Sequence, residues 1–223
     1  MLDHFLAVLL LVIVPIRALW RSRSGRMASG TKIGRYIATI GMVTGMLVLL
    51  ATSWLMTGRS ASDLGLGVPA SALSLTGLGI AAAVLAILAW GVAERSSAAP
   101  TDAEPPPHDL MPETPLETQL FPFLCLAAGC GWEVLYRGFL LLYLQPITGL
   151  WGGVVITAMA YGAAHGVRTG KQFLASIVSA FAFTIGYAVT SSLWWLMLLH
   201  TGLMMLGAFA SRASRRNGRH AQV

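Results

Sequence analysis

Charge is the property that this sequence has least of. Only 11% of its 223 residues are Asp, Glu, Lys or Arg, whereas a soluble domain normally carries about 25%. So few charges cannot provide a hydrated surface for a chain that is 56% hydrophobic. The shortage therefore excludes an ordinary soluble globular domain.

Cysteine is also scarce, and alternating polarity is absent. The two cysteines, Cys125 and Cys130, lie five positions apart in one apolar block, which argues against a disulfide framework. Segments of about ten residues that alternate between apolar and polar, as a membrane barrel requires, do not occur. Neither a cross-linked small fold nor a barrel is therefore expected.

Long apolar blocks are what the chain does contain. Blocks of roughly 18 to 24 residues are long enough to cross a bilayer as helices, and in hydrocarbon the backbone must satisfy its own hydrogen bonds. We predict an all-α fold, a polytopic transmembrane helical bundle of about seven helices. The predicted spans cover approximately residues 4–20, 36–57, 70–92, 119–145, 150–166, 171–190 and 192–211.

These spans divide the chain into four parts. Residues 1–92 hold three helices, residues 119–211 hold a four-helix core, and residues 212–223 form a basic tail. The connecting segment, 93–118, has six prolines and six acidic residues against one basic residue. We expect this linker to be extended or disordered, because such a composition cannot build a core.

The basic residues indicate how the helices are oriented. They gather in the segments 21–35, 168–171 and 212–219, which is typical of membrane topology and not of nucleic-acid binding. Seven helices with the N-terminus outside place all three segments in the cytoplasm. The first block has its arginines after it, the reverse of a signal peptide. We therefore predict a multi-pass protein of the cell membrane, with a cytoplasmic C-terminus and no nucleic-acid partner.

Four ionisable residues within the predicted spans are the candidate catalytic residues. Placing a charge at mid-helix costs about 2.5–3.5 kcal/mol on insertion scales, so each one calls for an explanation. They are Glu133, Arg137, His165 and His200. Glu133 and Arg137 are four apart and share a helix face, which predicts an internal ion pair. Cys130 lies one turn earlier, where we expect a small packing residue in preference to a metal ligand.

The two histidines are candidate metal ligands. Neutral imidazole suits Zn²⁺, and a catalytic zinc keeps an open position for water, beside which a carboxylate can act as general base. His165 and His200 belong to different helices. In the predicted topology they are offset by about 10 Å along the membrane normal, so tilt must bring them together.

Three motifs, in order, carry a resemblance to a known family. W-E-V-L-Y-R-G at 132–138 is similar to an E-E-x-x-x-R-G motif, Y-G-A-A-H at 161–165 to an aromatic-x-x-x-His motif, and S-L-W at 192–194, followed by His200, to a third. Residues 119–209 thereby resemble the CPBP intramembrane metalloproteases, also called the CAAX-protease, bacteriocin-processing or Abi family.

The resemblance implies a membrane endopeptidase. Some relatives cleave prenylated C-terminal tails, and others are linked to bacteriocin maturation or immunity. In relatives the first Glu activates water, the second Glu and the Arg support the site, and two His with an Asn or Asp complete it. The expected partners are then membrane lipid and a peptide or membrane-protein substrate, with Zn²⁺ as the expected cofactor. No feature specifies an oligomeric state.

The sequence departs from the family pattern at two positions. Trp132 stands where the first Glu is expected, and Met204 where the Asn or Asp is expected. Two alternatives follow. The chain is an endopeptidase with an atypical, weakened site, in which Glu133 serves as base. Alternatively it is a catalytically inactive member that acts as a membrane scaffold or a bacteriocin-immunity-type binding protein. A transporter is disfavoured, because no internal repeat is visible.

Overall fold

The computed structural model describes residues 1–24, 30–97, 110–167 and 169–220, and over these residues the regular structure is helical throughout. In chain order the helices are α1 (Leu2–Val8), η1 (Leu9–Ile13), α2 (Val14–Arg23), α3 (Lys32–Met56), η3 (Ala61–Leu64), α4 (Ala72–Ser97), α5 (Pro115–Leu126), η4 (Ala127–Gly131), η5 (Val134–Leu140), α6 (Leu141–Ala164), α7 (Gly170–Thr190) and α8 (Trp194–His220). Of these, η1, η4 and η5 are π-helices and η3 is a 3₁₀-helix. This confirms the predicted all-α fold.

Six helical stretches among the described residues are long and apolar enough to cross a membrane. One of them, Pro115–Ala164, has 50 residues, about twice what one crossing needs. It reverses at Gly149, whose φ of 72° and ψ of 169° are not helical. After the reversal Gly153 packs closely against Leu141. A Cβ atom at position 153 would lie only 3.0 Å from Leu141 Cδ1. The two passes predicted for residues 119–145 and 150–166 are therefore a hairpin within one helical stretch, and the count agrees with about seven.

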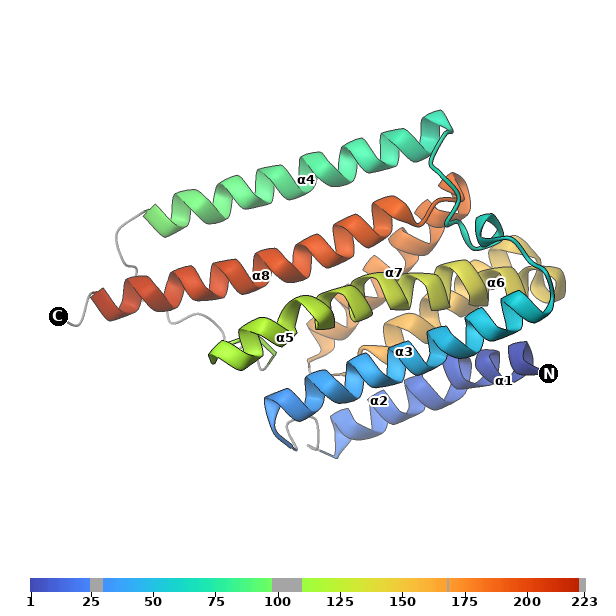
Figure 1. Cartoon of the computed structure of the whole chain (residues 1–223), viewed down its shortest axis with the longest axis horizontal. Helices are drawn as coiled ribbons and strands as arrows, with labels where there is room; N and C mark the ends of the chain where they lie inside the picture. The colour runs from blue at the N-terminus through green and yellow to red at the C-terminus, as the bar shows by residue number, and fades with distance from the viewer. Residues whose placement is uncertain (25–29, 98–109, 168, 221–223) are drawn as a thin grey trace.

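The helices form a bundle with two distinct ends (Figure 1). The N-terminus, the α3–α4 loop, the turn at Gly149 and the α7–α8 turn lie at one end. The other end holds the end of α2, the starts of α3, α5 and α7, and the end of α8. Arg21, Arg23, Lys171 and Arg212 lie at these helix ends, so we call this the basic end. The predicted basic segments thus share one side.

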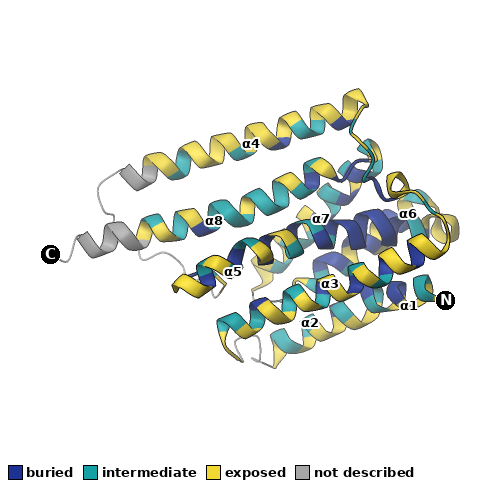
Figure 2. Cartoon of the chain, in the orientation of Figure 1, coloured by how far each residue is buried: buried dark blue, intermediate teal, exposed yellow. Residues whose placement is uncertain are grey.

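Burial is concentrated around the hairpin. In Figure 2 the buried residues gather along η5 and α6, whereas α4 is exposed over most of its length. The exposed side chains of α4 include Ile80, Ile87 and Trp90. In a bilayer such apolar exposure is expected, because lipid is as apolar as the side chains. The polar site described below therefore sits in the most enclosed part of the molecule.

One π-helical segment explains how the N-terminal helix is held. In η1 the N–H of Val14 donates to the carbonyl of Leu9, five residues earlier. In the same pattern, the N–H of residue 15 would donate to the carbonyl of Leu10. Pro15 has no N–H, and the Tyr136 hydroxyl donates to Leu10 O instead, at 2.9 Å. This bond fastens the N-terminal helix to η5.

The linker is described only at its two ends. α4 continues to Ser97, five residues beyond the predicted span, and α5 begins at Pro115, so the extended or disordered conformation predicted for 93–118 is wrong at both ends, where the backbone is helical. The middle of the linker, 98–109, lies outside the described residues. After the gap, Lys32 at the start of α3 pairs with Glu113 at 3.0 Å and with Glu117 at 3.5 Å. Thr114 caps α5 in a capping box with Glu117. The segment before α5 is thus attached to α3.

Candidate active site

Glu133 lies at the junction of two π-helical segments. η4 ends at Gly131 and η5 begins at Val134, so Glu133 stands between them. Such π-bulges inside helices occur frequently at functional sites. The Glu133 side chain is fully buried, so its charge must be satisfied by protein groups.

The ion pair predicted between Glu133 and Arg137 is present. Arg137 Nη1 lies 3.2 Å from Glu133 Oε2 and donates to Oε1 at 3.3 Å. Both side chains are 0% exposed. A buried pair of this kind is stable only when further partners offset the loss of hydration.

His200 provides one of these partners. Its Nδ1 lies 2.8 Å from Glu133 Oε1, and the carboxylate accepts that hydrogen. The contact joins α8 to the Glu133 helix, and it depends on a very close approach of the two. A Cβ on Gly129 would lie 2.3 Å from Thr201 Oγ1 and 2.8 Å from Thr201 N. Only glycine at position 129 therefore lets α8 lie close enough for His200 to reach Glu133.

Arg137 has two further contacts. Its Nε donates to Thr184 Oγ1 at 3.3 Å, and its Cζ lies 3.8 Å from the centroid of the Tyr161 ring. A guanidinium over an aromatic face gains electrostatic stabilisation from the ring. The buried charges of Glu133 and Arg137 are therefore balanced by groups from α6, α7 and α8.

His165 reaches this cluster indirectly. It follows α6, its Nδ1 donates to the Tyr161 carbonyl at 3.0 Å, and its ring packs edge-on against the Tyr161 ring at 4.6 Å. Within the described residues no hydrogen bond joins it to Glu133 or His200, although it lies within electrostatic range of both. The structure therefore brings Glu133, Arg137 and His200 into contact and places His165 beside them, one aromatic ring away.

His165 and His200 both use Nδ1 for their hydrogen bond, which leaves Nε2 for other partners. Each has its Nδ1 next to an acceptor, a carbonyl for His165 and a carboxylate for His200. A neutral imidazole that donates from Nδ1 keeps an acceptor lone pair on Nε2. Each Nε2 can therefore accept a proton or bind a metal.

The described donors do not fit a zinc site with three protein ligands. Such a site needs three groups around one point, and among the described residues no three His, Cys, Asp or Glu side chains lie close enough to hold a metal ion. The two Glu133 oxygens face Arg137 and His200. The zinc ion remains a prediction.

Met204 and Cys130 take packing roles, whereas Trp132 lines a cavity. Met204 packs on a separate apolar cluster that includes Tyr36 and Phe121, so the position where the family has Asn or Asp is apolar. Cys130 Sγ lies 3.5 Å from Thr201 Oγ1, which agrees with the packing role expected for it. Trp132 is half-buried and lines a cavity together with His165.

Sequence reasoning missed two members of the site. Tyr161 was recognised only as the aromatic residue of a motif, and Thr184 carried no signal, because one threonine in an apolar helix is common. Both contact Arg137.

Arg137 Nη2 and Thr157 Oγ1 are buried and have no hydrogen-bond partner among the described residues. Such atoms can receive polar groups of a ligand.

Comparison with known proteins gives one match. Residues 114–206 match the family described as type II CAAX prenyl endopeptidase Rce1-like. This range contains Glu133, Arg137, His165 and His200, and the match confirms the resemblance inferred from the three motifs. No curated protein and no solved structure matches the chain.

Proposed function

Because residues 114–206 match a CAAX prenyl endopeptidase family, we propose that this membrane protein is an intramembrane endopeptidase whose base is a Glu133–His200 pair. The single observation that supports this is the 2.8 Å contact between Glu133 Oε1 and His200 Nδ1. It joins two helices at the most enclosed part of the bundle. No apolar packing requirement accounts for a carboxylate and an imidazole there.

The pair suits general-base catalysis. Glu133 holds the Nδ1–H of His200 and stabilises the imidazolium that forms when Nε2 takes a proton, as the carboxylate does in a Ser-His-Asp triad. His200 Nε2 removes a proton from water, and the water oxygen bonds to the carbonyl carbon of the scissile peptide. The C–N bond then breaks as the same proton passes to the leaving amine. The role of base thus moves from Glu133, which is buried, to His200.

The other candidate residues have supporting roles in this scheme. Arg137 holds the Glu133 side chain in place through its guanidinium, which lies 3.2 Å from the carboxylate. His165 faces the cavity and can accept a hydrogen from the water or from the substrate through Nε2. The site lacks the first Glu of the family motif, so we expect cleavage to be slow.

A second function is favoured by Trp132. An indole lines the cavity at the position where the family has a carboxylate, while Glu133 is fully buried. The corresponding proposal is a catalytically inactive member that binds a membrane peptide or protein as a scaffold or immunity protein. Such a member would bind its partner at the cavity and would not need the Glu133–His200 pair as a base.

Cleavage of a prenylated C-terminal peptide by the purified protein discriminates the two. We expect slow cleavage, detected by mass spectrometry, that falls at least 100-fold in His200→Ala and in Glu133→Gln. A matched control is His4→Ala, which removes an imidazole far from the site. If wild-type protein shows no cleavage and Trp132→Glu gains it, the inactive-member proposal is correct.

The metal and the orientation are proposed with this function. Zinc content is measured on the purified protein, and loss of zinc in His165→Ala together with His200→Ala would support metal dependence. We further propose that the basic end faces the cytoplasm in the cell membrane. Labelling of cysteines introduced after Thr57 and after Thr169 tests the orientation, because only the former should react from outside.

A further inference from the structure

A cavity of 510 Å³ lies at the basic end between α2, α3 and the end of α6. Three arginines line it, Arg17 and Arg21 from α2 and Arg35 from α3, and among the described residues no Asp or Glu does. Within the described residues neither Arg17 nor Arg21 forms an ion pair, and Arg17 Nη1 contacts only Met42 Sδ, at 3.8 Å. The cavity is therefore strongly positive.

The start of α3 adds to this potential. Gly30, Thr31 and Gly34 line the same cavity, and the Thr31 hydroxyl caps the helix by accepting the N–H of Gly34 at 3.0 Å. The first turn of a helix carries a partial positive charge and exposes N–H groups. Arginines and a helix N-terminus that converge on one space favour an anion with several oxygens.

Most of the remaining lining is apolar, with Thr39 and His165 as the polar exceptions. Val14, Ala18, Ala38, Met42 and Trp132 contribute carbon surface beside the arginines. A simple inorganic anion would leave most of this surface uncovered. The fitting ligand is therefore amphiphilic, with an anionic group at one end and a hydrocarbon chain at the other.

We propose that this cavity binds an anionic phospholipid, with its phosphate on Arg17 and Arg21 and an acyl chain over Val14, Met42 and Trp132. A lipid is favoured over a peptide because η1 and α2 expose the apolar side chains of Ile13, Ile16 and Trp20, as expected of a lipid-facing surface, and because basic flanks attract anionic headgroups. His165 lines the same cavity. A bound lipid would cover that residue, whether or not the protein cleaves peptides.

Thermal unfolding of the purified protein in neutral detergent tests the proposal. Added phosphatidylglycerol should raise the melting temperature at lower concentration than phosphatidylcholine does. Arg17→Gln combined with Arg21→Gln should weaken this response at least tenfold in concentration, and Arg21→Gln alone should weaken it partially. The control is Arg23→Gln, which removes the same charge from the same helix outside the cavity and should leave the response intact.

Other outcomes would overturn it. An equal loss in Arg23→Gln would mean that the response comes from the basic flank in general. An equal response to phosphatidylcholine would mean that only the apolar surface binds. Stabilisation by glycerol phosphate alone at the same concentration would identify a free anion as the ligand, and stabilisation only by a peptide with a free carboxylate would identify a peptide site.

Discussion

Two arginines in this molecule have nearly the same set of partners and very different surroundings. Arg137 pairs with Glu133, bonds to a threonine and lies over a tyrosine ring. Arg59, at the end of the bundle that holds the N-terminus, pairs with Asp3 at 3.0 Å and lies 3.7 Å over the Trp54 ring. Each network thus combines a carboxylate, a guanidinium, hydroxyls and an aromatic ring.

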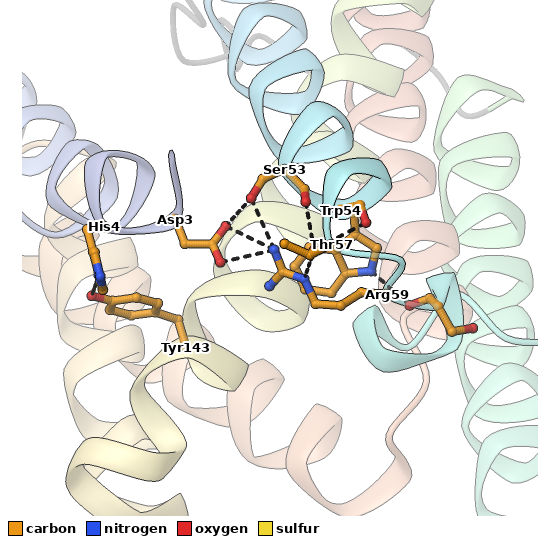
Figure 3. A network of polar contacts seen from close by, with 8 residues as sticks. Asp3, His4, Ser53, Trp54, Thr57, Arg59 and Tyr143 are labelled. Carbon is orange, nitrogen blue, oxygen red and sulfur yellow. Dashed lines mark hydrogen bonds and ion pairs between the residues drawn. The ribbon is translucent and has the colours of Figure 1, made fainter. Parts of the chain in front are cut away.

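The Arg59 network is drawn in Figure 3. Arg59 Nε donates to Thr57 Oγ1 at 2.7 Å, and the Ser53 hydroxyl donates to Asp3 Oδ1 at 2.6 Å. Trp54 Nε1 donates to Ser60 O at 2.8 Å. These bonds join α1, the end of α3 and the loop that follows it, so the network fastens the N-terminus to the α3–α4 loop.

Exposure and one imidazole distinguish the two. The Arg59 and Asp3 side chains are 28% and 27% exposed, whereas Arg137 and Glu133 are both 0% exposed. Only the buried carboxylate is also bound by a histidine that keeps a free nitrogen. A charged pair alone is therefore a structural contact. Full burial of the Glu133–Arg137 pair, together with the bond from His200, is what makes the Arg137 network a candidate site.

Removing one charge from each pair should produce the largest difference. Arg137→Met leaves the Glu133 carboxylate buried without its cation, which costs about 3–5 kcal/mol. Arg59→Met leaves Asp3 partly in solvent and costs about 1 kcal/mol. Unfolding in mixed micelles measures both. Equal losses would show that burial does not separate the two networks.

Displacing the histidine is the next strongest test. Gly129→Ala places a methyl group against Thr201 and should move α8 away, at a cost of about 1–3 kcal/mol and with loss of the His200–Glu133 contact. Gly79→Ala in α4 is the matched control, because nothing lies within 4 Å of a Cβ there. The readout is unfolding together with peptide cleavage. A Gly129→Ala protein that keeps both would refute the close-approach argument.

A double-mutant cycle should give an intermediate effect. Glu133→Gln, His200→Gln and the double variant together measure the coupling between the two side chains, which we expect to be about 1–3 kcal/mol, the range for neighbouring polar groups in one network. The same cycle on Asp3 and Ser53 should give about 0.5–1.5 kcal/mol. A coupling near zero for Glu133 and His200 would remove the basis of the proposed base.

The smallest effect is expected from Ser53→Ala. It removes a hydroxyl that donates to Asp3 and accepts from Arg59 Nη2, while Arg59 still binds the carboxylate directly. The loss should be about 1 kcal/mol, because the direct ion pair remains. Thermal unfolding against Ser179→Ala, whose hydroxyl is exposed on α7, provides the comparison.

The sequence predicted what lies close along the chain. The Glu133–Arg137 pair follows from four-residue spacing, and the helical passes follow from the length of apolar blocks. Contacts between helices were much harder to predict from the sequence. The approach of His200 to Glu133 depends on Gly129 meeting Thr201, and small residues occur at many positions in membrane helices. Asp3 and Arg59 lie at the ends of different spans, where charges are ordinary, so their pairing had no sequence signal.

The positive cavity shows a further limit of sequence reasoning. Arg21 and Arg35 belong to the segment 21–35 that indicates membrane orientation, and a basic flank of this kind is explained fully by topology. Only the structure shows that Arg17, Arg21 and Arg35 from two helices line one space with Trp132 and His165. Residues outside the family-matching range thus shape the surroundings of a residue within it.

The fastening of Lys32 to Glu113 and Glu117 has a consequence for how the protein can be assembled. Together with the Tyr136–Leu10 bond, it joins η1 and α3, which belong to the first two membrane passes, to the rest of the bundle through side chains. A protein made as two separate polypeptides, divided between Ser97 and Leu110, should therefore reassemble in the bilayer as a non-covalent pair. Co-purification of the two pieces, lost when Lys32→Glu is combined with Tyr136→Phe, would demonstrate that the peptide connection itself is dispensable.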